Sequence, residues 1–465
     1  MPEAPKRMSQ TDAGVAHGRR RREELPRQRL ATLGERHPGF DPLMTLRTQA
    51  EGRVPELLAI RDERMAVDEF AFLRGSAAIM AYDLAMTPST QIETQLCGDA
   101  HVANFGVFAS PERRLTFDVN DFDETLRGPF DWDVKRMAAS AAVAMRGLGS
   151  SEKAIAKALR RGVRTYREAM INLAGRGNLD VWYLSLDVDS HIDELRAAFT
   201  DESGSRVDQL LARARKKDSK RAFRKLVGET DGTFGFIADP PLIVPLDELL
   251  ASGGRTETPS AVLHTALDGY AATLTSDRQH LLSTYEPVDM ARKVVGVGSV
   301  GTRCFVVLLM GRDEDDPLIL QIKEATTSVL EAHLGADHHV NAGDRVVAGQ
   351  RLLQTTPDAF LGSWRAEYSP TEHHDFYFRM FHDSKASVDF TRVNSEEIFT
   401  RYIELCAWAL ARAHARAGDR AAMAAYLGRS DSFDRAVADW SMAYIDRNAA
   451  DYRAFVATLE PAQPS

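Results

Sequence analysis

The sequence reads QLCGDAHVANFGVF from Gln95 to Phe108, with an aspartate and an asparagine five positions apart between two short apolar runs. These runs are typical of short strands, so Asp99 and Asn104 are predicted to share one loop. In phosphoryl transfer a loop aspartate accepts or orients the proton of the attacking hydroxyl, and an asparagine holds a metal ion beside the phosphates. Turn-forming hydrogen bonds explain most such pairs, so the interpretation needs support from the rest of the chain.

A second acidic stretch, NDFDE at residues 120–124, follows one predicted hairpin later. Three carboxylates within four positions repel one another in a partly buried site, and a cation would relieve that repulsion. Mg²⁺ prefers hard oxygen ligands, and one or two protein carboxylates together with phosphates suit it. The sequence therefore predicts a magnesium site in which Asp121 and Asp123 join Asn104.

The stretch GPFDWD at residues 128–133 starts a predicted amphipathic helix. Asp131 and Asp133 fall in its first turn, where a carboxylate can cap free backbone N–H groups. The same carboxylates could instead support the loop that carries Asp99. The sequence leaves both alternatives open.

A glycine-rich stretch, GVGSVG at residues 296–301, lies between two predicted strands. Its spacing also occurs in dinucleotide-binding turns, but a helix follows those turns, whereas the strand TRCFVVLL follows here. A strand, a glycine loop, a second strand and a third strand ending in Lys323 form the arrangement that covers nucleotide phosphates and places a lysine against them. We expect Lys323 to meet a carboxylate or a phosphate, the alternative being an exposed lysine that protects a sheet edge.

The composition excludes several classes of protein. With 465 residues, 44% of them hydrophobic and 27% charged, the chain is expected to fold into about two or three packed lobes. Its net charge of -9 argues against nucleic acid as the main partner. The absence of a long apolar segment argues against a membrane partner, and three widely spaced cysteines indicate neither disulfides nor a zinc site, so we expect a cytoplasmic protein.

Two adjacent histidine pairs, His338-His339 and His373-His374, are the remaining candidates for metal ligands. Neighbours along a strand point to opposite sides, so such pairs suit a metal poorly without a third ligand. We expect both pairs to lie on the surface.

Taken together, GDAHVANF, NDFDE and GPFDWD resemble the catalytic and metal-binding run of the aminoglycoside phosphotransferase and choline kinase branch of the protein-kinase-like superfamily. Over nearly its whole length the chain is also similar to a bacterial domain-of-unknown-function family, number twenty-two fifty-two. That second resemblance rests on stretches such as RMAVDEFAFLRGSAAIMAYDLA, VGVGSVGTRCFVVLL and LARAHARAGD. The kinase-like resemblance implies ATP and Mg²⁺ as cofactors, whereas the bacterial family implies no substrate.

Carried over residue by residue, the kinase-like resemblance implies a role for each matching position. These roles are catalysis by Asp99, metal binding by Asn104, Asp121 and Asp123, and nucleotide binding by Lys323 beneath the loop residues Gly296, Gly298, Ser299 and Gly301. Glu331 is the expected partner of Lys323, with Glu324 the weaker choice because neighbours along a strand face opposite ways. The chain departs from the pattern at Cys97, where histidine is usual, and at Arg303, where a small apolar residue is usual.

The order of these stretches is unusual. In kinases the glycine loop and the lysine precede the catalytic aspartate, whereas here Lys323 follows Asp99. The stretch ELCAWALARAHARAGD at residues 404–419 resembles the helix that precedes the catalytic loop in phosphotransferases. Starting the chain near residue 290 restores the usual order, so the resemblance implies a circular permutation, which neighbouring chain termini permit.

We therefore expect an α+β, bilobal, protein-kinase-like fold that is circularly permuted and carries helical insertions. The expected parts are a polar arm at 1–44, a helical lobe with the catalytic and metal-binding loops at 45–285, a strand-rich nucleotide lobe at 286–394 and the rest of the helical lobe at 395–465.

The expected function is that of an ATP- and Mg²⁺-dependent phosphotransferase acting on a hydroxyl or amine of an unidentified small-molecule acceptor. One alternative is nucleotidyl transfer to a protein (AMPylation), and another is a nucleotide-binding regulatory pseudokinase. Asp99 favours catalysis, because a protein that only binds nucleotide needs no proton acceptor.

Overall fold

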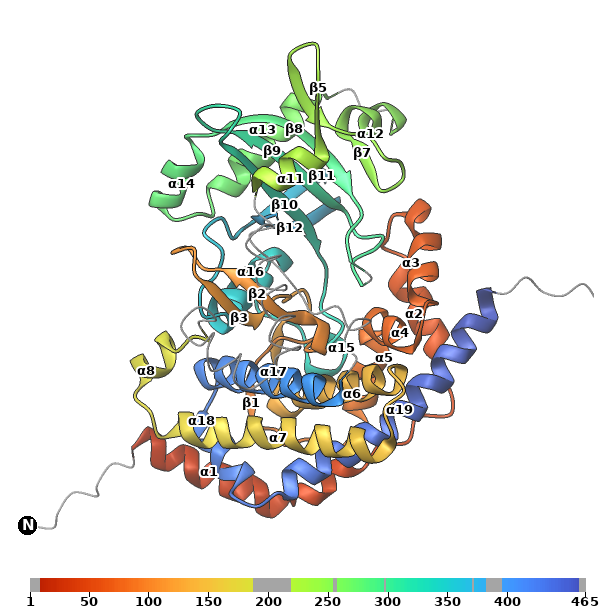
Figure 1. Ribbon diagram of the computed structural model, residues 1–465, viewed down its shortest axis with the longest axis vertical. Coiled ribbons are helices and arrows are strands. Elements are labelled where there is room, and N and C mark those ends of the chain that lie inside the picture. Colours follow the sequence, from red (N-terminus) through yellow and green to blue (C-terminus); the bar gives the residue numbers. More distant parts are fainter. Residues whose placement is uncertain are drawn as a thin grey trace, which may run out of the picture.

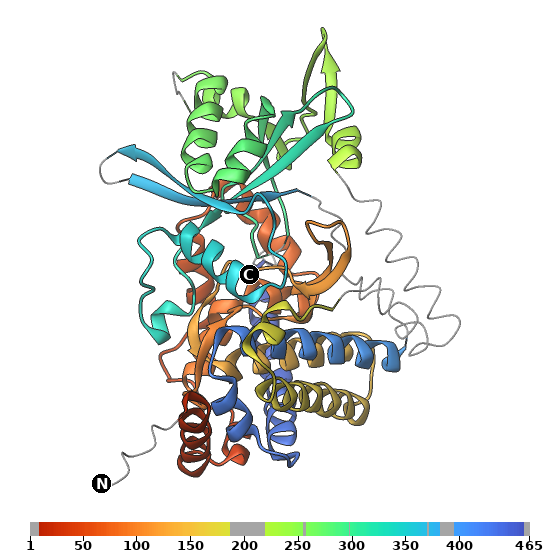
Figure 2. The same ribbon diagram turned by 90° about the vertical axis from the view of Figure 1, so that its left-hand side faces the viewer.

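The structure is a computed structural model that describes residues 9–186, 219–253, 257–296, 298–369, 372–381 and 395–459. Helices account for 54% and strands for 17% of the chain, so the expected α+β class is confirmed. A lobe built on a sheet lies above a larger lobe built of helices (Figure 1), and the view from the side shows the same two layers (Figure 2).

The upper lobe is organised by a six-stranded antiparallel sheet with the strand order β11-β12-β10-β9-β8-β7. Its strands are β7 Ile243–Pro245, β8 Glu286–Lys293, β9 Cys304–Met310, β10 Pro317–Ala325, β11 Gly362–Ser369 and β12 Glu372–Met380. Strand β10 lies between β9 and β12 and is buried along its whole length. The sheet therefore places Lys323, near the end of β10, in the interior.

Helices and a hairpin cover the two faces of this sheet. On one face Val307 and Leu309 of β9 pack with residues of the helices α12 Leu246–Ser252, α13 Pro259–Ala271 and α14 Ser276–Leu282. On the other face Val306 and Leu308 pack with α11 Ser219–Leu226 and the hairpin of β5 Val227–Thr230 and β6 Thr233–Phe236.

The boundary between the lobes differs from the sequence-based expectation. The sequence predicts residues 45–285 as part of the helical lobe, whereas residues 219–282 pack on the sheet. The physical reason is that alternate residues of a strand face opposite ways, so the fully apolar strand β9 requires a cover on each side. The helices that precede β8 supply that cover.

The lower lobe surrounds the helix α6 Phe130–Gly147, which is buried from Phe130 to Met145. Its main packing partners are α7 Glu152–Ala174, α17 Glu396–Ala417 and α19 Ser432–Leu459. Further helices of this lobe are α1 Gln10–Glu24, α2 Pro42–Ala50, α3 Leu58–Met65, α4 Glu69–Gly75, α5 Ala77–Ala85, α8 Asn178–Tyr183 and α18 Arg420–Leu427. Segments from both ends of the chain thus form one core.

Two small antiparallel pairs lie where the lobes meet. Strand β1 (Glu93–Leu96) pairs with β4 (Leu126–Pro129), and β2 (Phe105–Ala109) pairs with β3 (Leu115–Val119). The loops at residues 97–104 and 120–125 connect these strands, so the sheet pairing brings the two acidic stretches of the sequence side by side.

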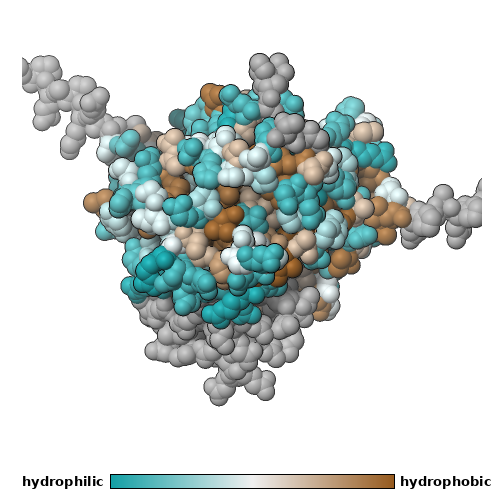
Figure 3. Space-filling view, turned by 90° about the horizontal axis from the view of Figure 1, so that it is seen from above, coloured by the Kyte–Doolittle hydropathy of each residue, from teal (hydrophilic) through white to brown (hydrophobic). Residues whose placement is uncertain are grey.

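The surface of the upper lobe is mixed in character. Seen from above, hydrophobic residues form small separate patches among hydrophilic ones (Figure 3). No helix in the described part of the chain is both long enough and apolar enough to cross a membrane.

A buried ion pair joins α17 to the strand β3. Arg412 Nη2 lies 2.7 Å from a carboxylate oxygen of Asp118 in β3, and the two side chains are 1% and 0% exposed. Replacing Arg412 by alanine leaves the Asp118 carboxylate buried without its cation. We expect Arg412→Ala to lower the free energy of unfolding by about 3–5 kcal/mol, measured by urea denaturation.

Arg435→Ala is the matched control, because the ion pair of Arg435 with Asp431 is about half exposed, at 53% and 46%. Its cost should not exceed about 1 kcal/mol. Equal losses of stability in the two variants would contradict the importance given to the buried pair.

Candidate active site

A polar cavity of about 120 Å³ lies between the lobes. Its walls come from the loop at residues 97–104 (the Asp99 loop), the loop at residues 120–125 (the acidic loop), the glycine loop and the helices α2, α4 and α5. The sequence-predicted site residues that line it are Asp99, Asn104, Asp121, Asp123, Gly296, Gly298 and Ser299. The cavity thus brings together stretches that are far apart in the sequence.

The loop that carries Asp99 is held by a carboxylate of α6. Asp133 accepts hydrogen bonds from the backbone N–H groups of Cys97 at 2.7 Å and Gly98 at 3.0 Å. No side chain caps α6, so of the two alternatives for Asp133 the structure supports its role beneath the loop. Asp131 instead accepts the backbone N–H of Thr90 at 3.0 Å.

Gly98 allows the Asp99 loop and the acidic loop to approach each other closely. Its φ of 86° lies in the left-handed region, which side chains other than glycine rarely adopt. A Cβ atom at this position would also lie 2.0 Å from the carbonyl oxygen of Glu124. The residue before Asp99 therefore has to be glycine.

Arg136 fixes the orientation of Asp99. Its Nε lies 2.7 Å from Asp99 Oδ1, and its side chain is 3% exposed. The other carboxylate oxygen, Oδ2, lies 3.7 Å from His101 Nε2. Asn104 closes the loop by donating from its amide to the carbonyl oxygen of Asp99 at 2.8 Å.

His101 is a site residue that the sequence argument missed, although it stands two positions after Asp99. It is 4% exposed and lines the cavity. Burial lowers the pKa of His101 to about 4, so the ring is neutral at pH 7. Its Nδ1 atom is buried without a hydrogen-bond partner among the described residues.

Lys323 connects the sheet to the acidic loop. Its ammonium lies 2.5 Å from Asp123 Oδ2 and 3.6 Å from Asp121 Oδ1, and the side chain is 2% exposed. Burial alone would lower the pKa of Lys323, but the two carboxylates outweigh it and hold the pKa well above its ordinary value. Tyr377 donates its hydroxyl to the second oxygen of Asp123 at 2.5 Å. Lys323 is therefore charged and holds both carboxylates in place.

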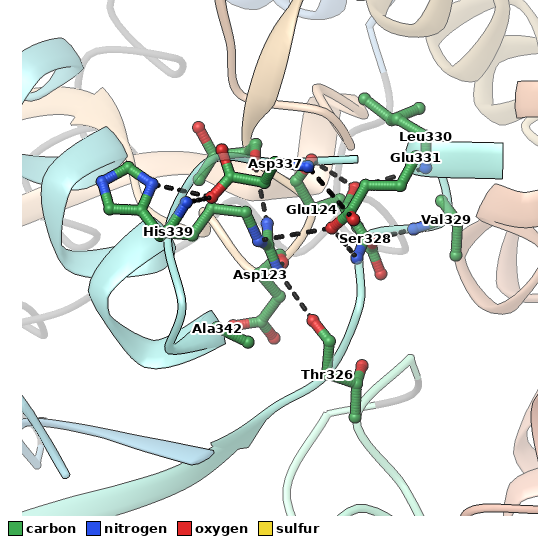
Figure 4. Close-up of polar contacts among 12 residues, drawn as sticks. Asp123, Glu124, Thr326, Ser328, Val329, Leu330, Glu331, Asp337, His339 and Ala342 are labelled. Carbon is green, nitrogen blue, oxygen red and sulfur yellow. Dashed lines mark hydrogen bonds and ion pairs between the residues drawn. The ribbon is translucent and has the colours of Figure 1, made fainter. Parts of the chain in front are cut away.

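The expected partner of Lys323, Glu331, lies elsewhere. Its carboxylate accepts the backbone N–H groups of Ser328 at 3.0 Å and Asp337 at 3.3 Å, as the close-up of this region shows (Figure 4). Glu331 begins the helix α15 Glu331–Leu334, which directs its side chain toward the preceding loop. The weaker candidate, Glu324, pairs with Arg303 at 3.0 Å, because it faces away from Lys323 along β10.

The helix α16 and the loop that precedes α15 both hold the acidic loop in place. The side chain of Arg345, in α16 Ala342–Leu353, donates to the carbonyl oxygens of Asp123 at 2.9 Å and Thr125 at 2.6 Å. Val329 donates its backbone N–H to Glu124 Oε2 at 2.7 Å (Figure 4). Burial raises the pKa of Glu124 to about 7, in spite of the opposing effect of that hydrogen bond.

The glycine loop is tied to the segment that precedes α4. Within the chain between α2 and α3, Arg53 donates to the carbonyl oxygen of Gly298 at 2.9 Å, and Val54 donates its backbone N–H to the carbonyl oxygen of Gly301 at 2.7 Å. Gly296 and Gly301 have φ values of 65° and 90°, which again require glycine. Gly301 contacts Arg53 and lies outside the cavity lining, as do Lys323 and Glu331.

Two arginines that the sequence argument missed give the cavity positive charge. Arg53 and Arg74 line it together with the carboxylates, and burial lowers the pKa of both. The Nε atom of Arg74 is buried without a hydrogen-bond partner among the described residues. A guanidinium matches the geometry of phosphate oxygens, so side chains of this type suit an anion.

Oxygen ligands for a metal ion are present in the same cavity. Both carboxylate oxygens of Asp123 already accept hydrogen bonds, from Lys323 and Tyr377. Asp121 and Asn104 line the same cavity and carry carboxylate and amide oxygens, the ligand atoms that suit Mg²⁺.

A second group of possible metal ligands lies on the surface. Asp337, His338 and His339 have ligand atoms within 4.8 Å of one another, and the His338 side chain is 77% exposed. Of the other histidine pair, the His374 side chain is 21% exposed and pairs with Glu324 at 2.8 Å. The exposed position of His338 agrees with the surface placement predicted for that pair.

The support that Asp133 gives to the Asp99 loop can be tested by hydrogen exchange. Asp133→Ala leaves the buried N–H groups of Cys97 and Gly98 without an acceptor, at about 1–3 kcal/mol for each group. We expect the backbone amides of residues 93–105 to exchange faster in mass-spectrometric measurements.

Asp439→Ala is the control, since Asp439 forms an exposed ion pair with Arg160 at 3.6 Å. It should leave that exchange unchanged. Unchanged protection of residues 93–105 in Asp133→Ala would show that other contacts hold the loop.

Comparison with known proteins gives the family of the chain. No curated protein and no solved structure matches it. The kinase-like resemblance and the circular permutation therefore stay predictions. One family model, described as an uncharacterized protein conserved in bacteria (DUF2252), matches residues 53–458. The match includes the Asp99 loop, the acidic loop and the glycine loop. The chain belongs to this bacterial family.

Proposed function

We propose that the chain binds ATP with Mg²⁺ at the polar cavity and transfers the γ-phosphoryl group to a hydroxyl or amine of a small-molecule acceptor. One observation carries this proposal. Asp99, Asn104 and Asp121 line the same cavity as Gly296, Gly298 and Ser299 of the glycine loop, although the chain from residue 125 to residue 295 separates them. A chance meeting of these residue types at one cavity is a weaker explanation than a common task.

The order of strands supports the proposal. The glycine loop connects the neighbouring antiparallel strands β8 and β9, and Lys323 lies on the next strand, β10. This is the arrangement in which kinases cover the phosphates with a glycine-rich loop and place a lysine on the third strand. Here Lys323 contacts Asp121 and Asp123, so the lysine connects the sheet to the proposed metal-binding loop.

Each residue then has a distinct role. Asp99, oriented by Arg136, takes the proton from the hydroxyl or amine of the acceptor. The oxygen or nitrogen of the acceptor then forms a bond to the γ-phosphorus as the bond from that phosphorus to ADP breaks. Arg74 and the backbone of the glycine loop bind the phosphate oxygens. Asp121 and Asn104 hold Mg²⁺, which when bound supplies positive charge to the phosphates.

The proposal requires metal-dependent binding of ATP. We expect Mg-ATP to raise the melting temperature, with about 2.7 kcal/mol of stabilisation at a hundredfold excess over the dissociation constant. ATP with EDTA should give a much smaller shift, because the carboxylates then repel the phosphates. The absence of any shift at millimolar Mg-ATP would exclude a nucleotide site.

The roles of the two aspartates differ in their effect on binding and turnover. Asp99→Asn should leave Mg-ATP binding nearly intact and lower transfer by about a hundredfold or more, because it removes the proton acceptor. Asp121→Asn should weaken metal-dependent binding itself. Equal effects of the two substitutions on the affinity for Mg-ATP would contradict these roles.

Transfer is measured with ATP labelled at the γ phosphate and, separately, at the α phosphate, against a panel of metabolites and a cell lysate. Label from the γ position on an acceptor supports the proposal. Label from the α position would establish nucleotidyl transfer instead, and binding without transfer of either label would establish a regulatory pseudokinase.

A further inference from the structure

A second, wider cavity of about 1110 Å³ opens beside the polar one. The two cavities share the wall residues Gln49, Arg53, Glu124, Thr302, Glu324 and Thr326. The wide cavity extends from this shared wall toward α2, α5 and α15. The two cavities therefore adjoin along these residues.

The sizes of the two cavities limit what each can hold. Sites for small molecules usually measure about 300–1,000 Å³. The polar cavity, at about 120 Å³, has room for phosphate groups and a cation but is too small for a whole nucleotide. The wide cavity, at about 1110 Å³, has room for a base and a ribose.

The walls of the wide cavity suit a planar ring. Phe40 and Tyr82 stack with their ring centroids 3.7 Å apart, and the ring of His333 meets Tyr82 edge-on at 5.9 Å. Met44 and Val329 add apolar surface to the same lining. Aromatic and apolar walls of this kind bind the faces of flat heterocycles.

Hydroxyl groups supply the polar part of the lining. The threonines and serine in the wall are Thr45, Thr48, Thr302, Thr326, Thr327 and Ser328. Hydroxyls both donate and accept hydrogen bonds, so they match the edge of a base and the hydroxyls of a ribose.

Side chains occupy part of the space between the sheet and the acidic loop. Arg379 bridges the two by donating to Gln321 Oε1 at 3.0 Å and to the carbonyl oxygen of Asn120 at 3.2 Å. Lys323 and Tyr377 occupy the adjoining positions through their contacts with Asp123. A base bound at this place would have to displace Arg379, which is half-buried and paired.

We propose that the base and ribose of the nucleotide bind in the wide cavity, and that the triphosphate passes Arg53 into the polar cavity. This inference rests on the proposed function. The base is covalently tied to the phosphates, so it must lie in a space that adjoins the polar cavity. The shared wall, the volume and the aromatic lining meet that requirement together.

The test compares two ligands in variants that fill the wide cavity. Ala78→Phe on α5 and Ala332→Phe on α15 each place a ring in it, and Ala332 is exposed, so phenylalanine there does not disturb the core. The ligands are Mg-ATP and magnesium with inorganic triphosphate, which has no base. Isothermal titration calorimetry gives both affinities, and Ala336→Phe, at an exposed position of the following loop, is the control.

We expect each filling variant to weaken Mg-ATP binding by about tenfold or more and to change triphosphate binding by less than about twofold. The control should change neither. Unchanged ATP affinity in both filling variants overturns the inference and leaves the proposed function standing. If these variants also lose transfer at unchanged ATP affinity, the acceptor and not the base binds in the wide cavity. If the wild-type protein binds neither ligand, the proposed function fails and the inference with it.

Discussion

The contact of the Lys323 ammonium with Asp121 and Asp123 is the interaction on which the arrangement of the site depends. A buried ammonium costs several kcal/mol unless carboxylates surround it, and two adjacent carboxylates repel each other unless a cation lies between them. Each side of this contact therefore requires the other. Because Lys323 belongs to the sheet and the aspartates belong to a loop of the helical lobe, the contact fixes one lobe against the other and gives the cavity between them its shape.

Two further side chains, Arg53 and Asp133, hold the loops that line the cavity. Arg53 holds the glycine loop through the carbonyl oxygen of Gly298, and Asp133 holds the start of the Asp99 loop through two backbone N–H groups. The result is a small space lined by both carboxylates and arginines. That balance suits a polyanion accompanied by a divalent cation better than either alone. A function for the family has to be argued from such a site, since the fold alone does not specify the chemistry.

Local patterns predicted much of this, and longer-range contacts set the limit. The loop from Gly98 to Asn104 and the strand that carries Lys323 follow from periodicity and turn residues, which act over a few positions. The cover of the sheet by residues 219–282 could not be predicted, because an apolar strand such as β9 shows that both faces are buried but not by what. The same limit applies to Arg53, Arg74 and Glu331. Their partners depend on how helices far along the chain are placed, and the spacing of residues does not contain that information.

The central claim is that Asp121 and Asn104 hold a divalent cation against the phosphates of a nucleotide. Electron–nuclear double resonance with Mn²⁺ in place of Mg²⁺ tests it directly, because the spectrum of bound Mn²⁺ reports phosphorus nuclei that lie beside the metal. With ATP present, the protein should give a spectrum with phosphorus couplings that differs from that of Mn-ATP in buffer, and Asp121→Asn should restore the buffer spectrum. A spectrum of the wild-type protein identical to that of free Mn-ATP would contradict the account.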